Sequence, residues 1–275
     1  TLGAVAGPNL VTPTGHVADA MGLPALSGPF ILAAFAYSLA GLTFLIFLKP
    51  DPFLVAKAIA SATKNQDIQD PQSQTEASFS NKPTVNRLGV FSGATVLILT
   101  HLVMVAIMTM TPIHMESHGS GLSLIGLIIG LHVAAMYLPS PITGSLVDRF
   151  GPTALVVASG ITLFISGLMA AWTPGDLIIP LAIALILLGL GWNFGLISGT
   201  TILIESTSIE NRAKTQGSVD VGVALAGSLG GLLSGMIVAA SSYAVLGYMG
   251  GYLSLLLIPL IIWTQSKKRK KALAA

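Results

Sequence analysis

Long apolar stretches recur along this chain, and each is long enough to cross a lipid bilayer as an α-helix, which takes about 20 residues. We predict spans at Pro29–Leu48, Leu88–Met110, Leu122–Val147, Pro152–Trp172, Leu177–Ile204, Val219–Ala240 and Tyr243–Thr264. Charged residues make up only 9% of the 275 positions, against about 25% in soluble domains. A bilayer offers no water to backbone N–H and C=O groups, so an isolated span must be a helix that pairs them internally. The sequence therefore predicts an all-α membrane protein.

The basic residues indicate how these spans are oriented. All 13 lysines and arginines fall in the segments 49–87, 147–151, 205–214 and 265–275. The connecting segments that alternate with them, 11–28, 111–121, 173–176 and 241–242, contain none. Basic loops stay on the cytoplasmic side of a membrane. We therefore place the basic segments in the cytoplasm and expect a multi-pass protein of the bacterial cytoplasmic (inner) membrane, with lipid as its surroundings.

A polar segment divides the chain. Residues 49–87 are rich in Gln and Ser and poor in large apolar side chains, so we predict a flexible cytoplasmic linker that cannot fold alone. Residues 88–264 then form a bundle of six helices, and residues 1–48 are the end of an earlier bundle. The chain begins at Thr1 with an odd number of spans, so we expect a piece of a longer protein. The run KKRKK in the tail, 265–275, is typical of an anchor at the anionic inner leaflet rather than of a nucleic-acid site.

Glycines and prolines predict how the helices pack and bend. Two helix faces carry one glycine per turn: Gly191, Gly195 and Gly199 on the first, and Gly227, Gly231 and Gly235 on the second. Such faces let membrane helices approach closely. Pro139 and Pro141 lie inside one predicted span and remove backbone donors there, so we expect a kink.

Two short motifs carry a family resemblance. The segment GSLVDRFG is similar to the G-x-L-x-D-R-x-G signature of the major facilitator superfamily, through Gly144, Leu146, Asp148, Arg149 and Gly151. The amino-terminal GAVAGPNL resembles the G-x-x-x-G-P motif of the family's fifth helix, through Gly3, Gly7 and Pro8. The resemblance implies that residues 1–10 end the fifth helix, that 29–48 is the sixth, and that 88–264 is the seventh to twelfth.

The same resemblance implies a mechanism and a gate. Members of the family move substrate by rocking two six-helix bundles about a central site. Asp148 and Arg149 would then latch the cytoplasmic gate. A salt-bridged tight turn is the structural alternative for these two residues.

Soft donor side chains concentrate in the spans on either side of the outer segment 111–121. Met104 and Met108 are four residues apart, as are His132 and Met136, so each pair shares one helix face. We expect the two helices to be antiparallel neighbours, with these residues at middle depth. Thioether and imidazole ligands together suit Cu(I). Methionine also fills gaps in apolar cores, which is the alternative for the methionines, but a histidine inside a span is costly and indicates function.

Further candidate metal ligands flank this set. His101 lies on the same side, one turn before Met104, and could be a relay to the site or a hydrogen-bonded helix contact. The outer segment HMESH supplies His114, Met115 and His118 as an accessory collecting point. The chain has no cysteine, whose thiolate would hold copper too tightly for a carrier to release.

The paired patterns M-x-x-x-M and H-x-x-x-M resemble those of the CcoA-like copper importers, a branch of the major facilitator superfamily. Met104, Met108, His132 and Met136 match both patterns in the same helices and order. The resemblance implies copper import for cytochrome oxidase assembly. A sister group in that branch imports riboflavin, so the alternative is transport of an organic solute, riboflavin or a drug-like compound. A receptor or assembly factor that uses the same fold is a third alternative.

Asp220 is a candidate for proton coupling, because an acid inside a span is a functional candidate. Its alternative role is an ion pair with Arg212, Lys214 or Arg149. The sequence contains no phosphate-binding loop, zinc-protease motif or dinucleotide-binding glycine motif. We therefore expect a gradient-driven transporter rather than an enzyme, with copper as cargo, no resident cofactor and no nucleic-acid partner.

Overall fold

The computed structural model describes residues 3, 6–50, 54, 55, 58, 86–174 and 176–273, without the side chains of residue 8 and of residues 268–273. Across these residues the chain is helical apart from short connections, and no strand occurs among them. Seven helical segments in this part of the chain are long and apolar enough to cross a membrane. The predicted all-α class and the predicted spans are both confirmed.

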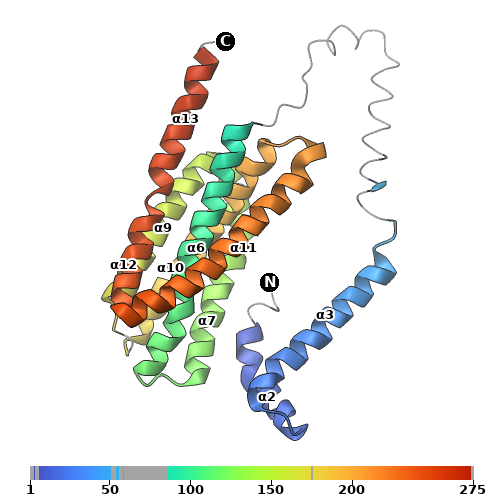
Figure 1. The fold of residues 1–275 in the computed structure, drawn as a ribbon, viewed down its shortest axis with the longest axis vertical. Coiled ribbons are helices and arrows are strands. Elements are labelled where there is room, and N and C mark those ends of the chain that lie inside the picture. Colours follow the sequence, from blue (N-terminus) through green and yellow to red (C-terminus); the bar gives the residue numbers. More distant parts are fainter. Residues whose placement is uncertain are drawn as a thin grey trace. The chain divides into compact units, whose positions relative to one another are not determined.

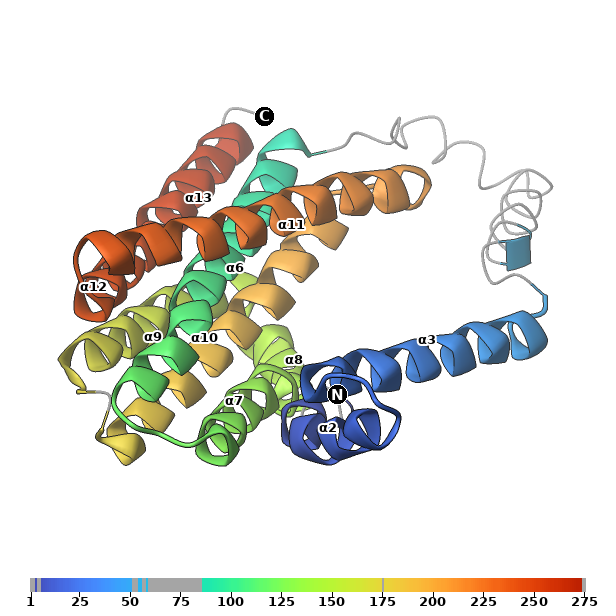
Figure 2. The same cartoon turned by 60° about the horizontal axis from the view of Figure 1, so that its bottom comes forward.

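The carboxyl-terminal part is a bundle built around two long helices. Its helices are α6 (Arg87–Ser117), α7 (Leu122–Tyr137), α8 (Ser140–Phe150), α9 (Pro152–Trp172), α10 (Ile178–Glu205), α11 (Ile209–Ala240), α12 (Tyr243–Ser254) and α13 (Leu257–Leu273). α6 packs along α10 and α11, and α10 packs along α9, α6 and α7 (Figures 1 and 2). α6 and α10 are therefore the centre of this bundle.

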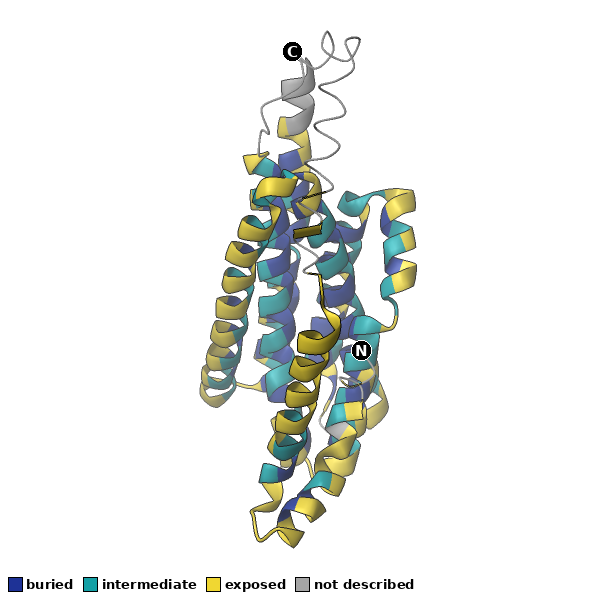
Figure 3. Ribbon diagram, turned by 90° about the vertical axis from the view of Figure 1, so that its right-hand side faces the viewer, coloured by how far each residue is buried: buried dark blue, intermediate teal, exposed yellow. Residues whose placement is uncertain are grey.

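Burial follows the same arrangement, because the buried residues of the bundle lie where its helices face one another (Figure 3). Of the most apolar 18-residue stretch of α10, 56% of the residues are buried, whereas in the corresponding stretch of α11 only 17% are buried. α11 therefore lies at the periphery, and most of its apolar surface is available to lipid or to another helix.

The glycine face predicted on α10 is a site of close helix packing. A Cβ added to Gly191 would lie 2.9 Å from the Leu163 side chain, and one added to Gly195 would lie 2.4 Å from the Thr100 side chain. Only glycine fits at such distances, so this prediction is confirmed. On α11, a Cβ added to Gly227 would lie 2.9 Å from a side chain of α6, but one added to Gly231 or Gly235 would have no neighbour nearer than 4.0 Å. The second predicted face is therefore only partly correct.

The predicted kink is confirmed as a break between two helices. α7 ends at Tyr137 and α8 begins at Ser140, with Leu138 and Pro139 between them. Pro139 has no N–H to donate to the carbonyl four residues earlier, which interrupts the helical hydrogen bonds. A second break, at Leu255 and Leu256 between α12 and α13, was not predicted, although Pro259 in the first turn of α13 lacks the N–H that would bond to the Leu255 carbonyl.

Several predicted helix ends are wrong in the same direction. α6 continues to Ser117 through the segment predicted as a loop, which leaves only 118–121 as the connection to α7. α11 begins at Ile209 rather than Val219, and α13 continues to Leu273 through the predicted basic tail. Hydropathy marks where a helix leaves the apolar part of a bilayer, but polar residues can continue the same helix into water.

The amino-terminal unit is described by itself. It contains α2 (Val11–Ala20), the short 3₁₀ helix Ala25–Ser27 and α3 (Gly28–Phe47). α3 is the predicted span at 29–48, and none of its most apolar window is buried (Figure 3). The loop predicted at 11–28 is wrong in part, because α2 lies within it. The helix tolerates Pro13, since this residue falls in the first turn, where its missing N–H has no helical partner to lose. The predicted linker, 49–87, lies almost wholly outside the described residues.

Candidate functional site

The three methionines of the predicted copper site lie in or against the main apolar cluster of the bundle. Met104 of α6 is 4% exposed and Met136 of α7 is 7% exposed, and both belong to a cluster that includes Leu188 and Trp192 of α10. Met108 is partly buried and packs against that cluster. The structure therefore brings the methionines into one apolar region, and the same surroundings suit plain packing.

The predicted arrangement of the two helices that carry these residues is wrong. α6 and α7 make few contacts with each other, whereas α10 packs along both of them. A short connection joins the ends of two helices but does not make them neighbours along their length. Met104 and Met136 instead share their apolar cluster with Leu188 and Trp192 of α10.

His132 of α7 has a fully buried imidazole, 0% exposed, with an unusual hydrogen-bond pattern. Its Nδ1 lies 2.8 Å from the backbone carbonyl oxygen of Leu185 on α10. A carbonyl can only accept, so Nδ1 carries the hydrogen and Nε2 of the neutral ring carries the lone pair. Nε2 is buried and has no hydrogen-bond partner among the described residues. Metal-binding histidines commonly donate their other ring N–H to a carbonyl in this way.

At the other end of α6, the accessory set predicted in HMESH is divided by the structure. The rings of His114 and His118 lie with centroids 4.5 Å apart, and His114 stacks on Tyr243 at 4.2 Å. Both histidines line a pocket of about 390 Å³, together with Trp172. Met115 is 1% exposed and belongs to the main apolar cluster instead. The two imidazoles therefore stay together as candidates, and Met115 does not join them.

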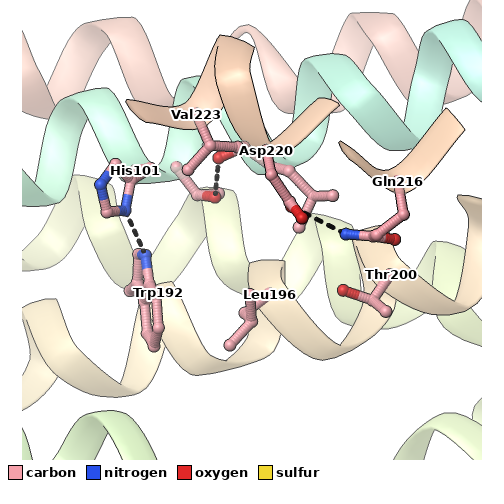
Figure 4. Close-up of a pocket in the computed structure, with 9 residues that line it drawn as sticks. His101, Trp192, Leu196, Thr200, Gln216, Asp220 and Val223 are labelled. Carbon is pink, nitrogen blue, oxygen red and sulfur yellow. Dashed lines mark hydrogen bonds between the residues drawn. The ribbon is translucent and has the colours of Figure 1, made fainter. Parts of the chain in front are cut away.

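His101 faces a second, smaller pocket between α6, α10 and α11 (Figure 4). The indole Nε1–H of Trp192 donates to Nδ1 of His101 at 3.2 Å. His101 is thus a hydrogen-bonded helix contact, which was one of the two predicted roles. The pocket has a volume of about 60 Å³, enough for a few water molecules.

Asp220 lines the same pocket from α11 (Figure 4). Its carboxylate accepts a hydrogen bond from Nε2 of Gln216 at 2.9 Å. No ion pair with Arg212, Lys214 or Arg149 is found in the part of the chain that the structure describes, so the predicted pairing alternative is wrong there. The carboxylate is exposed rather than buried.

Asp148 and Arg149 lie in the last turn of α8, and both are exposed. The signature segment is helical up to Phe150, and Gly151 alone joins α8 to α9, with a φ of +81° that favours glycine. Over the described ranges neither Asp148 nor Arg149 forms an ion pair, and the guanidinium lies 5.3 Å from the Phe150 ring centroid. The salt-bridged turn is therefore not what the structure shows, and the gate role stays a prediction.

Asn193 of α10 belongs to none of the predicted sites, yet it bonds to three residues of the neighbouring span. Its side chain is 0% exposed and donates from Nδ2 to the Met136 carbonyl oxygen at 2.8 Å and to the Ser140 hydroxyl at 2.9 Å. Its Oδ1 accepts from the Thr143 hydroxyl at 2.5 Å. The sequence did carry a signal for this role, because an asparagine inside an apolar span must find buried hydrogen-bond partners.

These features define a multi-pass helical membrane protein with polar side chains inside its bundle. Residues 93–275 match the Major Facilitator Superfamily. The chain belongs to that superfamily.

Similar proteins support the same assignment. The chain is 54% identical over 272 residues to the "Uncharacterized MFS-type transporter YddS" of Bacillus subtilis. The matched residues cover 99% of this chain and 61% of that protein. It is 54% identical over 267 residues to the "Uncharacterized MFS-type transporter YdeG" of the same organism, covering 97% of this chain and 61% of that protein. A third relative, the "Riboflavin transporter RfnT" of Brucella anthropi, is 29% identical over 171 residues, 62% of this chain and 42% of that protein. The chain thus spans about 61% of the length of the first two relatives.

Proposed function

We propose that this chain is the larger part of a secondary active transporter that works by alternating access in the cytoplasmic membrane. Membership in the superfamily and the seven apolar helices support this proposal. In such a transporter the helical bundles move as units, and polar groups inside the bundle recognise the cargo. In this scheme Asp148 and Arg149 belong to the cytoplasmic gate, and Asp220 is a candidate for coupling transport to a proton gradient.

For the cargo we propose Cu(I), bound by Met104, Met108, His132 and Met136. The single observation that carries this proposal is the His132 imidazole, whose Nε2 lone pair is buried without a partner while Nδ1–H is fixed by Leu185. An unpaired buried nitrogen costs stability unless something uses it. Methionine sulfurs in the adjoining cluster supply soft donors for the same ion.

Radioactive copper uptake in cells that carry the full-length transporter tests this proposal. Met108→Leu and Met136→Leu keep volume and apolarity, and such swaps usually cost less than about 1.5 kcal/mol of stability. Each should nevertheless sharply reduce copper uptake, because a soft donor is lost. Met249→Leu is the matched control, since Met249 lies on α12 and is 51% exposed. Normal uptake by both site variants at equal expression would reject copper as the cargo.

An organic solute is the second candidate cargo, and the similarity to the riboflavin transporter RfnT favours it. The family and the relatives reported above do not name copper. Leucine lines an apolar cavity as well as methionine does, so uptake of an organic solute should survive both methionine substitutions. Uptake of labelled riboflavin by the same cells, measured for the same variants, therefore separates the two cargoes.

A further inference from the structure

One line of contact on α10 holds both halves of the broken span. Leu185, Gly189 and Asn193 follow one another at four-residue intervals, so they lie along one face of α10. Leu185 accepts the hydrogen bond from His132, and a Cβ on Gly189 would lie 2.5 Å from the His132 carbonyl oxygen. These two contacts bind α10 tightly to α7, before the break at Leu138 and Pro139 is reached.

Asn193 is the point on this line that reaches across the break. One of its hydrogen bonds goes to Met136, in the last turn of α7, and the other two go to Ser140 and Thr143, in the first turn of α8. All the hydrogen-bonding capacity of the amide N–H groups is used on the two sides of the break. α8 otherwise contacts α10 and α9 only lightly, compared with the long packing of α7 on α10.

The break also separates two groups of residues with different proposed tasks. His132 and Met136, proposed to bind cargo, lie on α7, and the proposed gate residues Asp148 and Arg149 lie at the far end of α8. A helix interrupted by proline bends more easily at the interruption than elsewhere. The fixed angle between the two helices therefore depends on what bridges them.

We propose that Asn193 is a positioning residue that sets the angle between α7 and α8. Its hydrogen bonds hold α7, with the proposed cargo ligands, and α8, with the proposed gate residues, at fixed orientations to α10. The functional role of this angle rests on the proposed transport by alternating access, but the angle itself can be measured without any cargo. Loss of the bridge frees α8 while α7 stays attached through Leu185 and Gly189.

Distances between pairs of spin labels test this directly, because the chain has no cysteine and accepts introduced ones cleanly. Glu205→Cys on α10 is paired either with Ser145→Cys on α8 or with Leu131→Cys on α7, all at exposed positions. The measurement is made on the whole chain in lipid nanodiscs. Thr143→Val removes one bridging hydrogen bond at constant shape, and Asn193→Leu removes all three.

Both variants should broaden the distance distribution of the α8 pair, Asn193→Leu more than Thr143→Val, and leave the α7 pair as narrow as in the parent. Ser198→Ala is the matched control, because Ser198 is buried on α10 but its hydroxyl bonds only to its own helix. It should change neither pair. An unchanged α8 pair in Asn193→Leu, or equal broadening of both pairs, would overturn the proposal. Failure of copper or riboflavin uptake would leave this result untouched, so the two proposals fail separately.

Discussion

His132 on α7 and Leu185 on α10 are joined by a hydrogen bond of 2.8 Å that leaves the opposite ring nitrogen buried and unpaired. If that nitrogen binds Cu(I), His132→Leu should abolish high-affinity copper binding. The fold should survive, because the substitution removes an unpaired buried polar atom together with its partner bond. Competition between the purified chain and a coloured Cu(I) chelator measures the affinity. An unchanged affinity in His132→Leu would make the histidine a structural contact between the two helices.

Asp220→Asn should separate transport from its driving force. The amide keeps the size of the carboxylate and can still bond to Gln216, so the pocket keeps its shape. The amide does not ionise at physiological pH and so cannot bind and release a proton during transport, and uptake should no longer increase when an inward proton gradient is imposed. Uptake into proteoliposomes with and without the gradient checks this. A gradient response like that of the parent protein would exclude Asp220 from coupling.

Gly195→Ala should destabilise the bundle. The added Cβ would lie 2.4 Å from the Thr100 side chain and 2.9 Å from the Ser159 hydroxyl, so α6 or α9 must move away from α10. Overpacking of this kind costs about 1–3 kcal/mol. Gly217→Ala on α11 is the control, because nothing lies within 4 Å of its Cβ position. Thermal unfolding in detergent, followed by circular dichroism, should show a lower midpoint for the first variant only.

The sequence was sufficient to predict what depends on local patterns. The seven spans follow from apolar length, and the interruption between α7 and α8 follows from Pro139 and Pro141. Each of these features is a property of a single segment, so no knowledge of its neighbours was needed.

Features that depend on which helices lie side by side in the bundle could not be predicted in the same way. Helical spacing placed His101 on the side of Met104, but the structure turns it toward Trp192 and the pocket that contains Asp220. Likewise Met115 and His114 are adjacent in sequence, yet one faces the core and the other an outer pocket. Which face of a helix meets which neighbour is decided by the whole bundle, and α10 lies along both α6 and α7.

The orientation predicted from the basic residues can be tested with fusions. A reporter that is active only in the periplasm should give signal when fused after Gly119, in the connection between α6 and α7. The same reporter fused after Gln74, in the predicted linker, should give none, because basic segments remain in the cytoplasm. The opposite pair of results would reverse the topology, and the assignment of a cytoplasmic gate would be lost with it.

The gate can be tested by Asp148→Asn in the full-length transporter. Asp148 is exposed at the end of α8 and forms no ion pair within the described ranges, so the substitution should change stability by no more than about 0.5 kcal/mol. If the carboxylate latches the cytoplasmic side when the bundles rock, uptake should nevertheless fall strongly while the amount of protein in the membrane stays constant. Asp176→Asn is the matched control, because Asp176 is an exposed acid in the connection before α10. Normal uptake by Asp148→Asn, whether copper or riboflavin is the cargo, would leave the last turn of α8 with a packing role alone.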